Sequence, residues 1–130
     1  MIKILLVDDH PSVRIGLRMR FGLEPDLHIV GEAGDGLAAI SMATALNPNI
    51  ILMDLEMPTL DGIAATHSLH CASSSSAVVI LTAHDTPDRR TQAKAAGAAA
   101  FMSKTGYVDK LIDVIRAVAT GTAAIQTQHA

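Results

Sequence analysis

The chain has 130 residues, a length that fits one domain with a single hydrophobic core. Ten basic and thirteen acidic residues give a formal net charge of −3, which provides no positive field for binding nucleic acid. One cysteine, Cys71, argues against a disulfide framework and suits a reducing compartment. We therefore expect a cytoplasmic domain that does not itself bind DNA.

A membrane segment has to be considered, because 49% of the residues are hydrophobic. The longest stretches without a formal charge run from residue 36 to 53 and from 62 to 84. The first contains Pro48 between two asparagines and the second contains four consecutive serines, so neither is a continuous apolar span. The first residues run directly into an alternating apolar segment without a basic leader. We expect no membrane insertion.

Short apolar runs alternate along the chain with longer segments of helical period, which is typical of a parallel sheet with crossover helices. Helix starts are indicated at Pro11, Asp61 and Thr86, and helix ends at Asn47 and Gly97. The pattern predicts an α/β fold, a five-stranded parallel sheet in a doubly wound arrangement. The predicted strands are residues 2–7, 27–33, 50–53, 77–81 and 99–102.

The third and fourth predicted strands are continuous apolar runs, so we expect both to be covered on both faces. The last helical segment begins near Val108 and has apolar residues at the spacing of a helix that lies on a sheet. These residues are Val108, Leu111, Ile112, Ile115 and Val118. The segment before it, residues 86–96, has no apolar side chain larger than alanine and predicts a loosely held helix.

Polar residues follow four of the five predicted strands. Asp8 and Asp9 follow the first strand, Asp54 the third, Thr82 the fourth and Lys104 the fifth. Right-handed crossovers bring the carboxyl ends of parallel strands to one edge, where open α/β sheets bind ligands. A single polar residue there is common because the chain surfaces at that point. The whole set predicts a functional site.

The chemistry of this set indicates a divalent cation and a nucleophile. Two carboxylates about 4 Å apart repel by roughly 4 kcal/mol at an effective dielectric of 20, so three ionised ones need a cation. Mg²⁺ prefers oxygen ligands, and Asp8 with Asp9 is the candidate metal dyad. Asp54 is the candidate nucleophile, since a carboxylate can accept a phosphoryl group. Lys104 and Thr82 are placed to stabilise that group.

Four motifs occur in order, and together they resemble a known family. They are LVDDHP at residues 6–11, MDLEMPTLDG at 53–62, LTA at 81–83, and AGA followed by FMSK between 96 and 104. The arrangement resembles the receiver domain of two-component response regulators, over residues 2 to about 120. The opening motif with residues 13–17, and the ending VIRAV at 114–118, are most similar to the LuxR-type (NarL/FixJ) subfamily.

The resemblance implies a flavodoxin-like fold with strand order 2-1-3-4-5. It also implies phosphoryl transfer from a sensor histidine kinase to Asp54. Mg²⁺ would be held by Asp9, Asp54 and the backbone carbonyl of Glu56, with Asp8 acting through water. Thr82 and Phe101 would be the switch residues beside Lys104. The expected activity is self-phosphorylation and self-dephosphorylation only, without enzymatic turnover.

Several residues depart from the usual family pattern or leave it open. Phe101 stands where tyrosine or histidine is frequent, and we expect it to turn inward on phosphorylation. Glu56 either binds Lys104, crowds the phosphoryl group or is solvated at the rim. His84 either screens the phosphoryl charge or lies in an exposed loop. His10 is interpreted as opening the first helix, and Arg89 with Arg90 as a solvated helix face.

The resemblance also raises the question of an output domain. We interpret residues 1–120 as the receiver and 121–130 as the start of a linker. A LuxR-type helix-turn-helix is absent, so DNA contact would need a further domain. A fragment of a longer regulator is favoured over a stand-alone receiver. Phosphorylation is expected to favour a homodimer, through either the first and last helices or the fourth and fifth units.

Two other functions compete with the phospho-acceptor. A haloacid dehalogenase-type phosphatase also uses Asp, Thr and Lys with Mg²⁺, but it places its nucleophile and acid as Asp-x-Asp. This chain has adjacent Asp8 and Asp9, and Glu56 two residues after Asp54. A degenerate receiver that serves only as a binding surface is disfavoured, because every acceptor-site residue is present.

Overall fold

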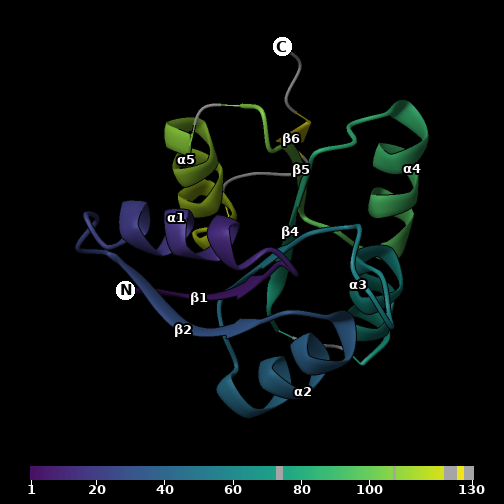
Figure 1. The fold of residues 1–130 in the computed structure, drawn as a ribbon, viewed down its shortest axis with the longest axis horizontal. Coiled ribbons are helices and arrows are strands. Elements are labelled where there is room, and N and C mark those ends of the chain that lie inside the picture. The colour runs from purple at the N-terminus through teal and green to yellow at the C-terminus, as the bar shows by residue number, and fades with distance from the viewer. Residues whose placement is uncertain (73–74, 107, 122–125, 128–130) are drawn as a thin grey trace.

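A central parallel sheet, covered by helices on both faces, forms the domain in a computed structural model (Figure 1). The structure describes the whole chain except residues 73–74, 107, 122–125 and 128–130. The strand order is β2-β1-β3-β4-β5-β6, with parallel pairing throughout. The predicted α/β fold and the order 2-1-3-4-5 are confirmed. The strands are β1 (Ile2–Val7), β2 (Leu27–Ala33), β3 (Ile50–Met53), β4 (Ala77–Thr82), β5 (Ala100–Ser103) and β6 (Gln126–Thr127).

The helices begin where the sequence places their capping residues. The side chains of Asp35, Asp61 and Thr86 each accept a hydrogen bond from a backbone N–H in the first turn of the helix that follows. The fourth helix ends at Gly97, whose φ of 103° lies in the left-handed region that favours glycine. The helices are α1 (Pro11–Phe21), α2 (Gly36–Leu46), α3 (Gly62–Cys71), α4 (Pro87–Ala96) and α5 (Val108–Ala119).

Two strands end one residue later than predicted, and one strand was not predicted. β4 includes Thr82 and β5 includes Ser103, because these two residues pair in the ladder. Strand limits commonly shift by a residue when sequence pattern alone is used. The two-residue β6 pairs with Ala100 and Phe101, within the region we interpreted as a linker.

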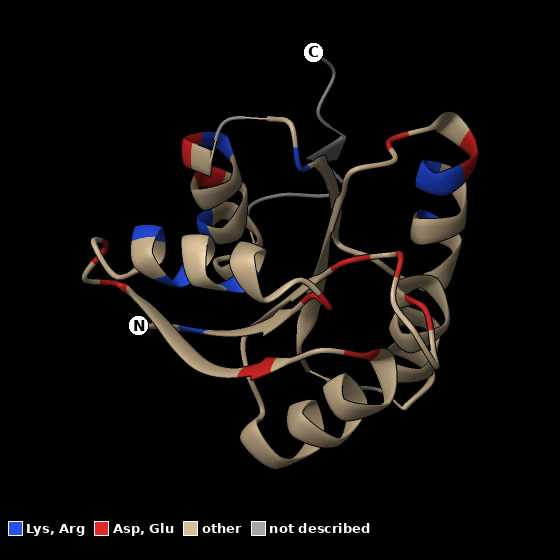
Figure 2. Ribbon diagram, viewed as in Figure 1, with Lys and Arg blue, Asp and Glu red and all other residues tan. Residues whose placement is uncertain are grey.

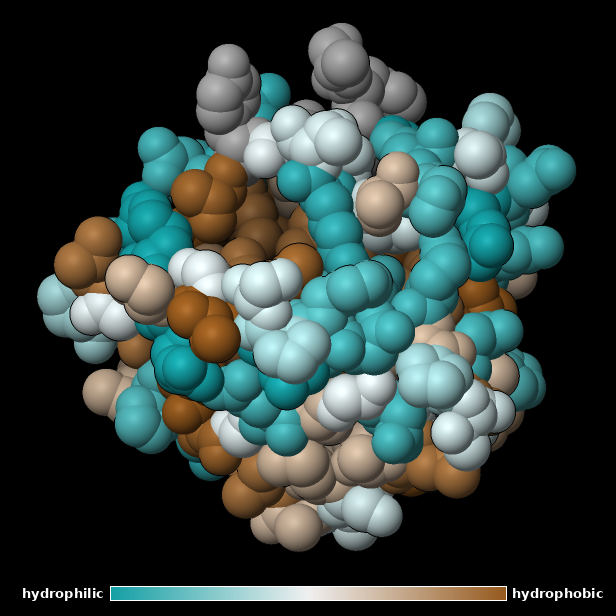
Figure 3. All heavy atoms as spheres, in the orientation of Figure 1, coloured by the Kyte–Doolittle hydropathy of each residue, from teal (hydrophilic) through white to brown (hydrophobic). Residues whose placement is uncertain are grey.

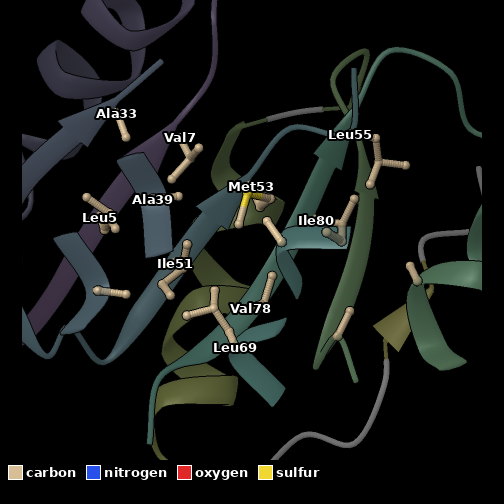
Figure 4. Close-up of a cluster of buried hydrophobic side chains, with 14 of the residues drawn as sticks. Leu5, Val7, Ala33, Ala39, Ile51, Met53, Leu55, Leu69, Val78 and Ile80 are labelled. Carbon is tan, nitrogen blue, oxygen red and sulfur yellow. The ribbon is translucent and has the colours of Figure 1, made fainter. Parts of the chain in front are cut away.

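Two hydrophobic clusters hold the helices on the sheet. One joins α2, α3 and α4 to one face, and Figure 4 shows how its side chains from β1, β3 and β4 point into a shared layer. The other joins α1 and α5 to the opposite face through Phe21, Leu111, Ile112 and Ile115. β3 is buried along its whole length and β4 beyond its first residue, in agreement with their predicted central positions. None of the described helices has the length and apolarity needed to cross a membrane.

The surface is uneven in charge. α2 carries no charged residue, whereas acidic and basic residues gather at the start of α4 (Figure 2). The space-filling view shows the same contrast, with hydrophilic spheres over α4 and hydrophobic ones over α2 (Figure 3). Near the centre of Figure 2, acidic segments follow β1 and β3 at neighbouring turns. The fold thus brings the predicted acidic residues to one edge of the sheet.

Candidate functional site

Two buried carboxylates share one ammonium group at the carboxyl edge of the sheet. Lys104 Nζ lies 2.7 Å from Asp8 Oδ2 and 3.3 Å from Asp54 Oδ2. Asp8 and Asp54 are each 4% exposed. The three residues follow β1, β3 and β5, so the fold brings together groups that lie far apart in the sequence. One cation for two buried carboxylates leaves negative charge uncompensated.

Asp9 and His10 complete a group able to hold a metal ion. One ligand atom each from Asp8, Asp9, His10 and Asp54 lies within 4.8 Å of the others. Asp9 Oδ1 is buried without a hydrogen-bond partner among the described residues, although His10 Nδ1 lies 3.1 Å away. An orphaned carboxylate oxygen beside two further carboxylates fits a hard cation such as Mg²⁺. The residues present therefore fit the metal that the sequence predicts.

Backbone contacts fix the acidic residues in place. Asp54 N–H donates to Val7 O at 2.9 Å, and Asp8 N–H donates to Ala33 O at 3.0 Å. The guanidinium of Arg14 donates to the backbone carbonyl of Asp8. Arg14 was not among the predicted site residues, because its position in the opening motif does not show that it contacts the backbone.

Gly62 allows the chain after β3 to fold back on itself. A Cβ atom at this position would lie 2.1 Å from the backbone oxygen of Asp54. Gly62 N–H also donates to Leu55 O at 3.0 Å. Only glycine fits this close approach, so the residue supports the loop that carries Asp54.

Electrostatics distinguish Asp54 from an ordinary surface acid. Burial raises the pKa of the Asp54 carboxyl, the charge on Asp8 raises it further, and Lys104 opposes both effects. Burial lowers the pKa of Lys104, but the hydrogen bonds that its ammonium donates to Asp8 and Asp54, together with their negative charges, outweigh burial and leave that pKa raised. The Lys104 ammonium stays charged, while ionised Asp54 is held at an energetic cost that a cation or an added covalent bond would relieve.

Glu56 and His84 meet at the rim of the site. His84 Nδ1 lies 2.8 Å from Glu56 Oε1, and Arg89 Nη1 lies 3.9 Å from Glu56 Oε2. The proposed contact of Glu56 with Lys104 is not present, since the Glu56 carboxylate faces the β4–α4 loop. An open pocket of about 520 Å³ adjoins this pair. It is lined by Asp9, Leu55, Glu56, Met57, Pro58, Asp61 and Arg89.

Thr82 is fully buried, at 0% exposure, at the end of β4. Its hydroxyl oxygen accepts a hydrogen bond from His84 N–H at 3.1 Å. The backbone carbonyl of Thr82 accepts from Lys104 N–H at 2.7 Å, so Thr82 is next to a residue of the site, while its hydroxyl is tied to the loop that follows β4.

Phe101 and Arg90 differ from our expectations. Phe101 is 1% exposed, so the inward turn expected on phosphorylation is already made in this structure. Arg90 does not form part of a solvated face, because its guanidinium lies over the Phe101 ring, 5.4 Å from the centroid. The sequence contained no pattern that links Arg90 to Phe101, since the two residues meet only after α4 packs on β5.

The fold and the acidic edge define a receiver-type phospho-acceptor architecture. Residues 4–116 match the family model described as the response regulator receiver domain, and the chain belongs to this family. Membership implies a cognate histidine kinase and does not place the chain in a classical enzyme family.

Two similar proteins carry the name transcriptional regulatory protein. The chain is 36% identical to the transcriptional regulatory protein LiaR of Bacillus subtilis over 130 residues, which cover all of this chain and 62% of the relative. It is 37% identical to UhpA of Salmonella typhimurium over 121 residues, with 93% and 60% covered. The chain thus spans about 60% of the length of these relatives.

A solved structure shows the same architecture. The signal receiver domain of NarL from Mycobacterium tuberculosis superposes with a TM-score of 0.89 at 31% identity, covering 92% of this chain and 97% of that one. The predicted similarity to LuxR-type (NarL) regulators is confirmed.

Proposed function

We propose that Asp54 is the phospho-acceptor of this receiver domain. The observation that carries the proposal is the buried Asp54 carboxylate, whose pKa burial raises and which lies 3.3 Å from Lys104 Nζ. One carboxylate oxygen attacks the phosphorus of a kinase phosphohistidine, the P–N bond breaks, and the imidazole leaves with that electron pair. The product is an acyl phosphate on Asp54.

The surrounding residues hold the charge that develops. Lys104 is placed to contact a phosphoryl oxygen as its pairing with Asp54 is lost, and Thr82 can donate its hydroxyl proton to another. Asp9, Asp54 and the backbone carbonyl of Glu56 would hold Mg²⁺, with Asp8 acting through water. When bound, the metal would neutralise charge on the transferring group.

Glu56 and His84 are proposed to modulate the lifetime of the acyl phosphate, because Glu56 lines the same pocket as Asp9 and is paired with His84. Residues 1–120 are proposed as the receiver, with a linker from 121 onward that leads to a helix-turn-helix domain outside this chain. The regulatory names of the relatives support this proposal.

We also propose that phosphorylation favours a homodimer. Three exposed apolar side chains lie four residues apart on α1 and its end: Ile15, Met19 and Leu23, at 46%, 69% and 74% exposure. This spacing places Ile15 and Met19 on one face of α1, and Leu23 follows two residues after the helix ends. The stripe favours the first and last helices over the fourth and fifth units as the interface.

The acceptor proposal is tested by intact mass spectrometry after incubation with acetyl phosphate and Mg²⁺. We expect a gain of one phosphoryl group per chain, absent in Asp54→Asn and in excess chelator. Turnover of a small phosphate ester without a stable mass gain would favour the phosphatase and would overturn the proposal.

A further inference from the structure

Arg90 forms a clamp between the β4–α4 loop and the core of the sheet. Its Nε lies 2.7 Å from Asp85 Oδ1 and its Nη2 lies 2.6 Å from Asp85 Oδ2, a two-pronged ion pair. The same guanidinium lies over the buried Phe101 ring. The hydrogen bonds that Arg90 donates to Asp85 raise the pKa of Arg90, so the group stays charged. We call Asp85, Arg90 and Phe101 the α4 clamp.

The α4 clamp compensates for the small apolar area that α4 buries against the rest of the domain. Only Ala93 and Ala96 are buried on this helix. At about 25 cal/mol per Å² of apolar surface, two alanines stabilise a helix far less than the large side chains of α5 do. A guanidinium over an aromatic face adds an attraction that does not depend on apolar area on α4. Arg90 therefore adds a second attachment of α4 to the sheet, beside the two buried alanines.

The clamp also connects to the acceptor site through three neighbouring residues. Thr82 Oγ1 accepts from His84 N–H, and Asp85 is the next residue. Thr86 then caps α4 by accepting from Arg89 N–H at 3.2 Å. A displacement of the Thr82 hydroxyl toward a phosphoryl oxygen would break its bond to His84 N–H and move Asp85.

We propose that the α4 clamp is the coupling device through which the state of Asp54 sets the position of α4 in this chain. Movement of Asp85 withdraws the partner that orients the guanidinium, Arg90 leaves the Phe101 ring, and α4 loosens. Phe101 stays inward and serves as the fixed platform. The Phe101 ring has no hydroxyl that could exchange hydrogen bonds, so the contact that changes is the one with the Arg90 guanidinium. This inference rests on the proposed phosphorylation of Asp54.

The test is amide hydrogen exchange across α4, measured with and without acetyl phosphate and Mg²⁺, with the phosphoryl content of each sample read from its intact mass. The variant is Arg90→Lys, which keeps the charge but loses the planar stack and the paired hydrogen bonds. Arg89→Lys is the matched control, since Arg89 lies on the same helix and its guanidinium reaches the Glu56 carboxylate at 3.9 Å.

Without phosphorylation, we expect α4 to exchange roughly fivefold faster in Arg90→Lys than in the wild type, and Arg89→Lys to match the wild type. Phosphorylation should accelerate exchange in the wild type and in Arg89→Lys, but add little in Arg90→Lys. The effect of Arg90→Lys should shrink in a Phe101→Leu background, because the ring that the cation covers is gone.

Equal exchange in Arg90→Lys and Arg89→Lys would overturn the clamp. An undiminished response of Arg90→Lys to phosphorylation would overturn its coupling to Asp54. A failure of the acceptor proposal is distinguished by the mass, because such samples gain no phosphoryl group whatever their exchange rates.

Discussion

The buried negative charge of Asp54 destabilises the folded state at neutral pH. A carboxyl whose pKa is raised by folding stabilises the fold below its unfolded pKa, and this contribution is lost as the pH rises through the folded pKa. Asp54→Asn removes the buried charge. We predict a higher melting temperature at pH 7 without Mg²⁺, corresponding to on the order of 1 kcal/mol.

The gain in Asp54→Asn should shrink as the pH falls toward the ordinary carboxyl value of 3.8, because the raised pKa lets the folded wild-type carboxyl take up a proton and lose its buried charge. Thermal denaturation across this pH range measures it. Asp113→Asn, at an exposed position on α5, is the control and should show no such gain. A lower melting temperature for Asp54→Asn at pH 7 would contradict the electrostatic account.

Asp9 and Asp8 are expected to differ as metal ligands. Loss of an outer-shell group typically weakens metal binding by about 10–100-fold, which we expect for Asp8→Ala. Asp9→Ala should weaken Mg²⁺ binding more, since Asp9 is the proposed direct ligand and carries an orphaned oxygen. Calorimetric titration of both variants measures the difference, and equal losses would remove the distinction between the two roles.

At the residue scale, strand ends predicted which groups converge, because parallel strands deliver their following residues to one edge. Asp8, Asp54 and Lys104 meet for this reason. The pairing of Glu56 with His84, and of Arg90 with Phe101, was not predictable. Those contacts depend on side-chain directions in loops and on the packing of α4, which no periodicity encodes.

α4 and α5 differ in how much apolar surface they bury against the sheet. α5 buries Leu111, Ile112 and Ile115, whereas α4 buries two alanines. We predict faster amide exchange in α4 than in α5, because opening α4 exposes less apolar area. Hydrogen exchange of the unphosphorylated chain measures this, and crystallographic B-factors should be higher for residues 85–96. Equal protection of the two helices would mean that the clamp outweighs the apolar faces.

The exposed stripe on α1 predicts a dimer interface. Met19→Asp places a charge at its centre and should reduce dimerisation of the phosphorylated chain by tenfold or more, on the order of the cost of burying an unpaired charge. Leu37→Asp is the matched control, because Leu37 is 54% exposed on α2, across the sheet. Sedimentation velocity measures both, and a wild type that stays monomeric when phosphorylated would contradict the dimer.

At the element scale, apolar runs predicted the five main strands, start or end signals marked α1 to α4, and the apolar spacing marked α5. The one-residue shifts in β4 and β5 reflect the ladder pairing of Thr82 with Ser103, which is a property of two strands together. β6 escaped prediction because two residues are too short for an alternation pattern. The pattern within one segment therefore cannot predict strand ends that depend on pairing with a second strand, or strands as short as two residues.

The whole molecule combines a common scaffold with its own arrangement of charges. The family fold sets the acidic edge, and the relatives place such domains in transcriptional regulators. The rim pair and the α4 clamp are contacts that this chain's own residues add around that edge. We propose that the Glu56–His84 pair affects the lifetime of the acyl phosphate and that the α4 clamp transmits phosphorylation to α4. Both proposals require that Asp54 is the phosphorylated residue.

The most direct test locates the phosphoryl group. Borohydride reduces an acyl phosphate to an alcohol, so a phosphorylated aspartate becomes homoserine while a free carboxylate is unchanged. After treatment with acetyl phosphate and Mg²⁺, reduction and peptide mass spectrometry should place homoserine at position 54 alone. Homoserine at position 8 or 9, or a phosphorylated chain in which position 54 remains aspartate, would contradict the account.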